Sequence, residues 1–189
     1  IVVIAALGAL IGPALTPFDP AAQDLALRLT GPTTAHLFGL DELGRDILAR
    51  VLAGARISFL VGLTVVTVSS CVGTILGAIA GYFGGAIDDL ISRVIDTLLA
   101  FPGLLLAIAL VAVLGPSLGH VLFALTIIGW VGYARLVRGQ VLRAREFEYV
   151  QAARAIGAGA LRILLRHIIP TAIPAVVVQA TLGMAGAII

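Results

Sequence analysis

The chain has 189 residues, of which 60% are hydrophobic and only 12% charged, and its formal net charge is +2. Soluble domains carry roughly 45–50% apolar and about 25% charged residues, so a soluble domain and a disordered chain are both excluded. The single cysteine also excludes a disulfide scaffold. We therefore expect an all-α, polytopic membrane helix bundle. All 12 basic residues are arginine, so neither a P-loop lysine nor a Schiff-base lysine is available.

Five apolar runs are candidate membrane helices, since about 20 apolar residues cross a ~30 Å hydrocarbon core. The first run is too short by itself, and we interpret residues 1–12 as a truncated first helix. The last run continues to the end of the sequence. We therefore expect a fragment with both ends cut within helices and a sixth helix missing. In chain order the runs are residues 1–11, 57–80, 97–114, 118–134 and 171–189.

Residues 13–56 are expected to form an extracytoplasmic segment that ends in an amphipathic helix over residues 41–56. Asp41 is the expected N-cap of this helix. Asp46 and Arg50 are spaced i, i+4, so we expect them to form an ion pair. The helix either shapes the outer mouth and contacts a partner or lies flat on the bilayer. An apolar stripe follows at helical spacing: Leu43, Ile47, Val51 and Gly54.

Glycines recur every fourth residue in the expected second helix, at Gly73 and Gly77 within the apolar run and at Gly81 just after it. They form two overlapping GxxxG patterns, which let a neighbouring helix approach closely. We expect a helix-packing surface here, the alternative being that glycine is simply common in membrane helices. Residues 82–96 are expected to form an inner amphipathic stretch, with Asp88, Asp89 and Arg93 in water. Pro102 should then kink or start the next helix.

The orientation follows from residues 135–166, which carry seven arginines (135, 138, 143, 145, 154, 162 and 166) against two glutamates (146 and 148). The positive-inside rule places this region in the cytoplasm. Within it, residues 146–156 have a helical pattern, Gly157 and Gly159 break that pattern, and a second helix follows. The two expected apolar faces are Tyr149, Val150, Ala153 and Ile156 on the first helix, and Leu161, Leu164, Leu165 and Ile168 on the second.

Two interpretations of this helix–turn–helix remain open on spacing alone. It either anchors the chain to anionic lipid headgroups or docks into a groove on a soluble partner. The run from Tyr149 to Pro170 also resembles the EAA loop of ABC importer permeases. Ala152, Ala153, Gly157 and Pro170 match that motif at the right spacing. Gln151, His167 and Ile169 depart from it, and Gln151 replaces the charge of the motif glutamate.

Two further stretches resemble the C-type subunits of the dipeptide, oligopeptide and nickel branch of this family. One runs from His36 to Asp46 and continues to Ser58, and the other from Arg93 through Asp96 to Phe101 and Pro102. The resemblance covers nearly the whole chain, and its landmarks occur in the family order.

The resemblance implies the type I ABC importer permease fold, with a permease core at residues 57–189 and a cytoplasmic coupling loop at 139–170. It implies a binding-protein-dependent importer of di- or oligopeptides, or of nickel, in a prokaryotic inner membrane. The implied partners are a second homologous permease, two cytosolic ATPase subunits, an extracytoplasmic solute-binding protein and the bilayer, without nucleic acid. We expect ATP hydrolysis on those separate subunits, and no catalytic residue, metal site or cofactor in this chain. The residues expected to couple it to the ATPases are Glu148, Gln151, Ala152, Ala153, Arg154, Gly157 and Pro170.

The rival interpretation is a secondary transporter or a small channel that acts alone. Such a carrier normally keeps an ionisable residue within the membrane or contains an inverted repeat. The apolar runs carry no charge, and we see no such repeat in the sequence.

Overall fold

The structure, a computed structural model, describes residues 11–188, so the expected truncated helix at residues 1–12 lies almost wholly outside the described residues. Within that range the regular elements are helices, and strand pairing is limited to one isolated bridge between Leu40 and Asp46. The all-α fold is therefore confirmed. The chain divides into two compact units, chiefly residues 1–61 and 62–187, and each is described by itself.

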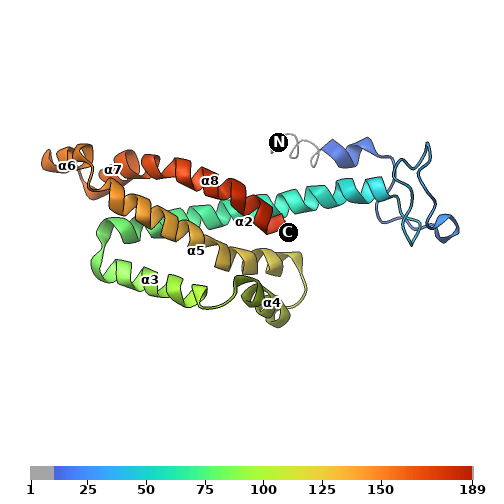
Figure 1. The fold of residues 1–189 in the computed structure, drawn as a ribbon, viewed down its shortest axis with the longest axis horizontal. Helices are drawn as coiled ribbons and strands as arrows, with labels where there is room; N and C mark the ends of the chain where they lie inside the picture. Colours follow the sequence, from blue (N-terminus) through green and yellow to red (C-terminus); the bar gives the residue numbers. More distant parts are fainter. Residues whose placement is uncertain (1–10, 189) are drawn as a thin grey trace. The chain divides into compact units, whose positions relative to one another are not determined.

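The elements follow in chain order (Figure 1). Two short 3₁₀ turns, η1 (Gly12–Leu15) and η2 (Leu25–Leu27), precede the long helix α2 (Ile47–Phe83). The helices α3 (Gly85–Leu99), α4 (Gly103–Leu114) and α5 (Leu118–Ala144) come next. The last elements are α6 (Glu148–Ala155), α7 (Ala160–Ile163), the π-helical turn η3 (Leu164–Ile168) and α8 (Ile169–Ile188).

Among residues 11–188, three helical stretches are long and apolar enough to cross a membrane: α2, α5 and the continuous run Ala160–Ile188. The pair α3 and α4 would count as a fourth span only if a bend of 84° between them is allowed. Of the expected span over residues 97–114, α4 covers residues 103–114, and residues 97–99 belong to α3. The expectation that Pro102 kinks or starts the next helix is confirmed. Pro102 lies at the N-cap of α4, has no N–H to continue α3 and restricts the residue before it.

The amphipathic helix expected over residues 41–56 begins only at residue 47. It also does not end at residue 56 but continues into the apolar run that starts at residue 57. Helix α2 starts at Ile47 and continues unbroken to Phe83, which makes it 37 residues long. Gly44 takes a φ of +70°, which no right-handed helix contains. Asp46, rather than Asp41, caps the first turn, because its Oδ1 accepts a hydrogen bond from the Ala49 N–H at 2.7 Å.

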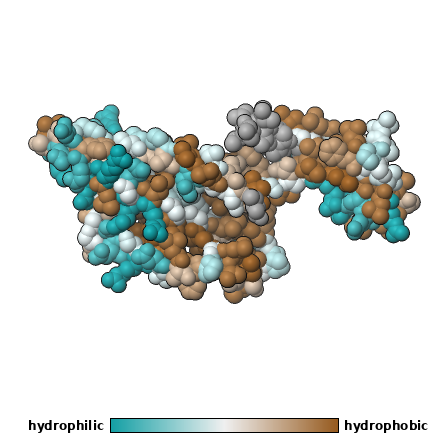
Figure 2. Space-filling view, viewed as in Figure 1, coloured by the Kyte–Doolittle hydropathy of each residue, from teal (hydrophilic) through white to brown (hydrophobic). Residues whose placement is uncertain are grey.

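The second unit is organised around α5. In Figure 1, α5 runs between α3 and α8, and its apolar side chains contact both neighbours. One buried cluster joins Val137 and Val141 of α5 to Ala78 of α2 and to Ile163 and Ile168 near the start of the last span. A smaller cluster joins α5 to α3 through Ile95. Figure 2 shows hydrophilic residues gathered at the end of this unit that carries α6, and hydrophobic ones over α4.

Candidate functional site

A helical hairpin, formed by residues 148–168, lies at the hydrophilic end of the second unit. Its first helix, α6, begins with Glu148 and has Arg154 in its last turn, so both charges suit the helix dipole. Gly157 then takes a φ of +83°. The Ala158 N–H donates to the Ala153 carbonyl at 3.0 Å, and the Gly157 N–H donates to the Arg154 carbonyl at 3.0 Å. These two bonds form a Schellman motif, which ends α6 and turns the chain toward α7.

The hairpin is fixed to the bundle by its inner, apolar face. Val150 and Ala153 of α6 are 0% and 8% exposed, and they pack with Ile163, Leu164 and Ile168 against α2 and α5. On the α2 and α5 side the partners are Ala78, Val137, Val141 and Ala144. This contact ties the position of the hairpin to the positions of two membrane helices.

Four other large apolar side chains of the hairpin are exposed, and we call this set its outer face: Tyr149, Ile156, Leu161 and Leu165. These side chains are 45%, 85%, 69% and 55% exposed. The two apolar faces expected from the sequence are therefore buried only in part, since each contains exposed residues of this set beside buried ones. Periodicity therefore could not tell which side faces the bundle. Exposed large apolar side chains on a hydrophilic end, such as Ile156, are typical of a contact site for another molecule, whereas Leu161 and Leu165 lie at the start of the last candidate span.

The other residues expected to act in coupling occupy different positions on the hairpin. Glu148, Gln151, Ala152 and Arg154 are exposed, while Ala153 is buried against the core. The Gln151 amide Nε2 donates to the Glu146 carbonyl at 3.2 Å, so it stabilises the start of α6. The coupling role of these residues stays a prediction.

The second arm of the hairpin enters the last membrane span through a π-helical turn rather than through a break. Pro170 is the second residue of α8 and, having no N–H, cannot donate to the preceding turn. The Ile169 N–H donates five residues back, to the Leu164 carbonyl. The widened turn accommodates Pro170 within one continuous helical stretch.

Aromatic contacts hold the base of the hairpin. The Arg143 guanidinium lies 6.0 Å from the centre of the Phe147 ring, within the range of a cation–π interaction. The Phe147 and Tyr149 rings are 5.7 Å apart, and the Tyr149 hydroxyl lies 3.5 Å from the His167 carbonyl oxygen. These contacts link the two arms to the end of α5.

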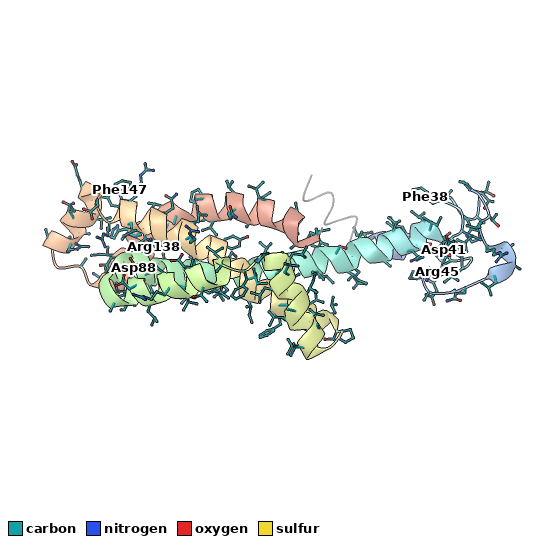
Figure 3. The ribbon with its side chains drawn as sticks, turned by 60° about the horizontal axis from the view of Figure 1, so that its bottom comes forward. Phe38, Asp41, Arg45, Asp88, Arg138 and Phe147 are labelled. Atoms are coloured by element: carbon teal, nitrogen blue, oxygen red, sulfur yellow. The ribbon has the colours of Figure 1, made fainter. Side chains whose placement is uncertain are left out.

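A bidentate ion pair, which we call the clamp, joins Asp88 near the start of α3 to Arg138 of α5 (Figure 3). The Arg138 Nη2 donates to Asp88 Oδ2 at 2.7 Å, and Nε donates to Oδ1. The two side chains are 15% and 35% exposed, so the expectation of a fully solvated Asp88 is wrong. Sequence reasoning missed this pair because its members lie 50 residues apart. The sequence did contain one indication of the pair: the chain has few charges, and a partly buried carboxylate or arginine needs a partner of opposite charge.

The three glycines of the GxxxG patterns lie where α2 meets α5. A Cβ atom added at Gly73 would lie 2.5 Å from Tyr133 Cβ. One added at Gly77 would lie 2.4 Å from the Ala134 carbonyl oxygen, and one at Gly81 would lie 2.9 Å from the Arg138 carbonyl oxygen. No real side chain fits at those distances, so the geometry supports the predicted packing role.

The first unit contains a polar loop centred on Asp41, labelled with Arg45 in Figure 3. The Asp41 carboxylate accepts hydrogen bonds from the Leu43 N–H at 2.8 Å and from the Arg45 N–H at 3.0 Å and Nε at 2.8 Å, and it pairs with Arg50. Burial raises the pKa of Asp41, but the two backbone N–H groups and the Arg45 guanidinium outweigh it and lower the pKa to about 2.

A second polar contact in this loop corrects the expected Asp46–Arg50 pair. The Oδ2 atom of the buried Asp46 lies 2.9 Å from His36 Nδ1, within hydrogen-bond distance, and Arg50 pairs with Asp41 instead. The backbone of Gly44 lies close to the backbone of Asp24. A Cβ atom added at Gly44 would lie 1.7 Å from the Asp24 carbonyl oxygen, so only glycine fits there. Within residues 11–188 no group of three or more His, Cys, Asp or Glu side chains could hold a metal ion.

Known proteins are similar to this chain over the regions described above. The model of the family described as binding-protein-dependent transport system inner membrane component matches residues 73–189, which include the hairpin and the clamp. The chain is 48% identical to the dipeptide transport system permease protein of Alkalihalophilus pseudofirmus over 181 residues, covering 96% of this chain and 60% of that protein.

Two other bacterial relatives are similar over the whole chain. The probable D,D-dipeptide transport system permease protein of Escherichia coli is 42% identical over 189 residues, or 63% of its own length. The oligopeptide transport system permease protein of Bacillus subtilis is 39% identical over 188 residues, or 62% of its length. The chain therefore spans about three fifths of the length of these curated relatives.

Proposed function

Because this chain belongs to the family of binding-protein-dependent transport system inner membrane components, we propose that it is part of the transmembrane subunit of an ATP-driven importer of di- or oligopeptides. The names of the relatives favour peptides over nickel as the substrate. The family description and the three long apolar helices support a location in the inner membrane of a prokaryote. A solute-binding protein on the outer side would deliver the peptide.

The observation that carries the proposal is the two-faced hairpin. Its inner face is buried against α2 and α5, whereas its outer face exposes Tyr149, Ile156, Leu161 and Leu165. A helix that presents apolar side chains in this way suits docking into a groove on a partner protein. A cytosolic ATPase subunit docked there would push or pull on two membrane helices when it binds ATP.

The energy for transport would come from the ATPase partners and not from this chain. The chain has no lysine and therefore no P-loop of its own. A second, homologous permease would complete the path, and two ATPase subunits would dock, one on each hairpin. Movement of the paired hairpins would then shift the two permeases between outward-open and inward-open states.

Reconstitution tests this proposal. The full-length permease and the proteins that purify with it would be placed in vesicles with the solute-binding protein and radiolabelled alanyl-alanine. We expect uptake that requires ATP on the side of the membrane where the hairpin lies and that survives collapse of the ion gradients. Uptake that needs an ion gradient and no ATP would instead support a carrier that acts alone.

A variant of the hairpin connects this activity to the structure. Gly157→Val places a β-branched residue at a φ of +83°, which costs of order 1–3 kcal/mol of backbone strain. We expect peptide uptake and peptide-stimulated ATP hydrolysis to fall while the amount of permease in the membrane stays the same. The control is Gly139→Val, because Gly139 lies in α5 with nothing within 4 Å of an added Cβ. Equal activity of the two variants would contradict the coupling role of the turn.

A further inference from the structure

A cavity of about 360 Å³, partly open to the surface, lies in the second unit and is lined by residues of α2, α4, α5 and α8. Its polar lining residues, Ser69, Tyr133 and Gln179, come from the middle portions of α2, α5 and α8. These three helices belong to the stretches that are long enough to cross a membrane. The cavity therefore lies at membrane depth, and it is formed by this chain alone.

The cavity is apolar with a few polar groups and no charge. None of its lining residues is Asp, Glu, Arg or His. Ser69 is 1% exposed, and its Oγ is the one buried side-chain polar atom without a hydrogen-bond partner among the described residues. The Tyr133 hydroxyl has only a long contact, 3.5 Å, to the Gln179 carbonyl oxygen. A buried hydroxyl without a partner costs about 1–3 kcal/mol, so a ligand that bonded to it would gain that stabilisation.

Small residues keep the cavity open. Gly129, Gly183 and Gly186 all line it. A Cβ atom at Gly129 would lie 2.5 Å from Ser69 Oγ, and one at Gly183 would lie 2.7 Å from the Tyr133 hydroxyl. An added Cβ at Gly186, which is exposed at the rim of the cavity, would meet nothing within 4 Å, so a larger side chain is sterically tolerated there.

We infer that this cavity receives an uncharged side chain of the transported peptide, and this inference rests on the proposed function. Its volume of about 360 Å³ lies at the lower end of the range of ligand pockets, so it suits one large side chain rather than a whole oligopeptide. The charged termini of a peptide are disfavoured in it, because the lining offers no counter-charge. A lipid tail would fill the apolar part but leave the Ser69 and Gln179 side chains without hydrogen bonds.

Thiol protection tests the inference directly. The full-length permease with its partners would carry Ser69→Cys in a Cys71→Ala background, since Cys71 is an exposed free thiol. Methyl methanethiosulfonate, a small neutral reagent, would label the new thiol. We expect alanyl-phenylalanine and alanyl-glutamine to slow labelling about tenfold, the scale of discrimination of an apolar pocket, and alanyl-alanine to have little effect. Labelling that no peptide slows would overturn the inference.

Uptake by a variant with a larger side chain in the cavity lining provides the second measurement. Gly186→Leu should lower uptake of alanyl-phenylalanine about tenfold while uptake of alanyl-alanine changes less than about twofold. The matched control is Gly132→Leu, since Gly132 lies in α5 outside the cavity lining with nothing within 4 Å of an added Cβ. Equal loss for both peptides would mean that the cavity serves packing, and it would contradict the inference.

The two measurements separate the inference from the function on which it rests. Wild-type uptake of peptides, without protection of the thiol in the Ser69→Cys variant and without a change in selectivity in Gly186→Leu, would overturn the inference alone. Protection without ATP-driven uptake would support the binding site and overturn the proposed function. Absence of both would overturn both.

Discussion

The clamp between Asp88 and Arg138 offers the sharpest test of how the second unit is held together. Asp88→Asn keeps the shape of the side chain but removes its charge, and it leaves the Arg138 guanidinium with only neutral acceptors. Breaking a fully buried ion pair costs about 3–5 kcal/mol, and an exposed pair contributes about 0.2–1 kcal/mol. Since the two side chains are 15% and 35% exposed, we expect a loss of about 1–2 kcal/mol, with most of it carried by the bidentate hydrogen bonds.

The assay is the denaturation midpoint of the full-length permease in detergent micelles, measured in a double-mutant cycle with Arg138→Gln. The control is Asp89→Asn, because Asp89 is exposed and has no ion pair among the described residues. We expect the double variant to lose less stability than the sum of the losses in the two single variants, Asp88→Asn and Arg138→Gln. A destabilisation by Asp88→Asn no larger than that of Asp89→Asn, or a cycle with additive effects, would refute the reasoning.

Three further outcomes are expected. Gly77→Ala should destabilise the bundle by about 1–3 kcal/mol, because the new Cβ would lie 2.4 Å from the Ala134 carbonyl oxygen, whereas Gly132→Ala should be neutral or stabilising in the same midpoint assay. Asp41 has a pKa lowered from 3.8 to about 2. Its contribution to the stability of the first unit is therefore present above pH 4 and is lost as the pH falls through 2. Amide hydrogen exchange in the first unit should accelerate over that pH range, and Asp41→Asn should remove this pH dependence. Ile156→Asp should lower retention of an ATPase partner without changing the denaturation midpoint, since this side chain is 85% exposed, and an unchanged retention would contradict docking at this face.

The membrane class and most helix positions could be predicted from the sequence because they depend on composition and on long apolar runs. The long run ending near Ala80 became part of α2, and the run beginning at Leu118 became α5. The turn of the hairpin could also be predicted, since glycine is the residue that most readily takes a positive φ, as Gly157 does. These features depend on local sequence.

Features that depend on distant residues could not be predicted in this way. The start of α2 is set by a loop in which Gly44 packs against Asp24, so an amphipathic pattern over residues 41–56 extended the helix too far. The pairing of Asp88 with Arg138 arises only when α3 folds back on α5. The cavity at Ser69 requires four helices to come together, and no spacing within one helix indicates it.

The central claim is that the outer face of the hairpin is the surface that an ATPase subunit grips. The most direct measurement places a photocrosslinking maleimide at Ile156→Cys in a Cys71→Ala background of the full-length permease in its native membrane. We predict a crosslinked product that contains a nucleotide-hydrolysing protein and whose yield changes when ATP binds. Crosslinks to phospholipid alone, with or without ATP, would contradict the account.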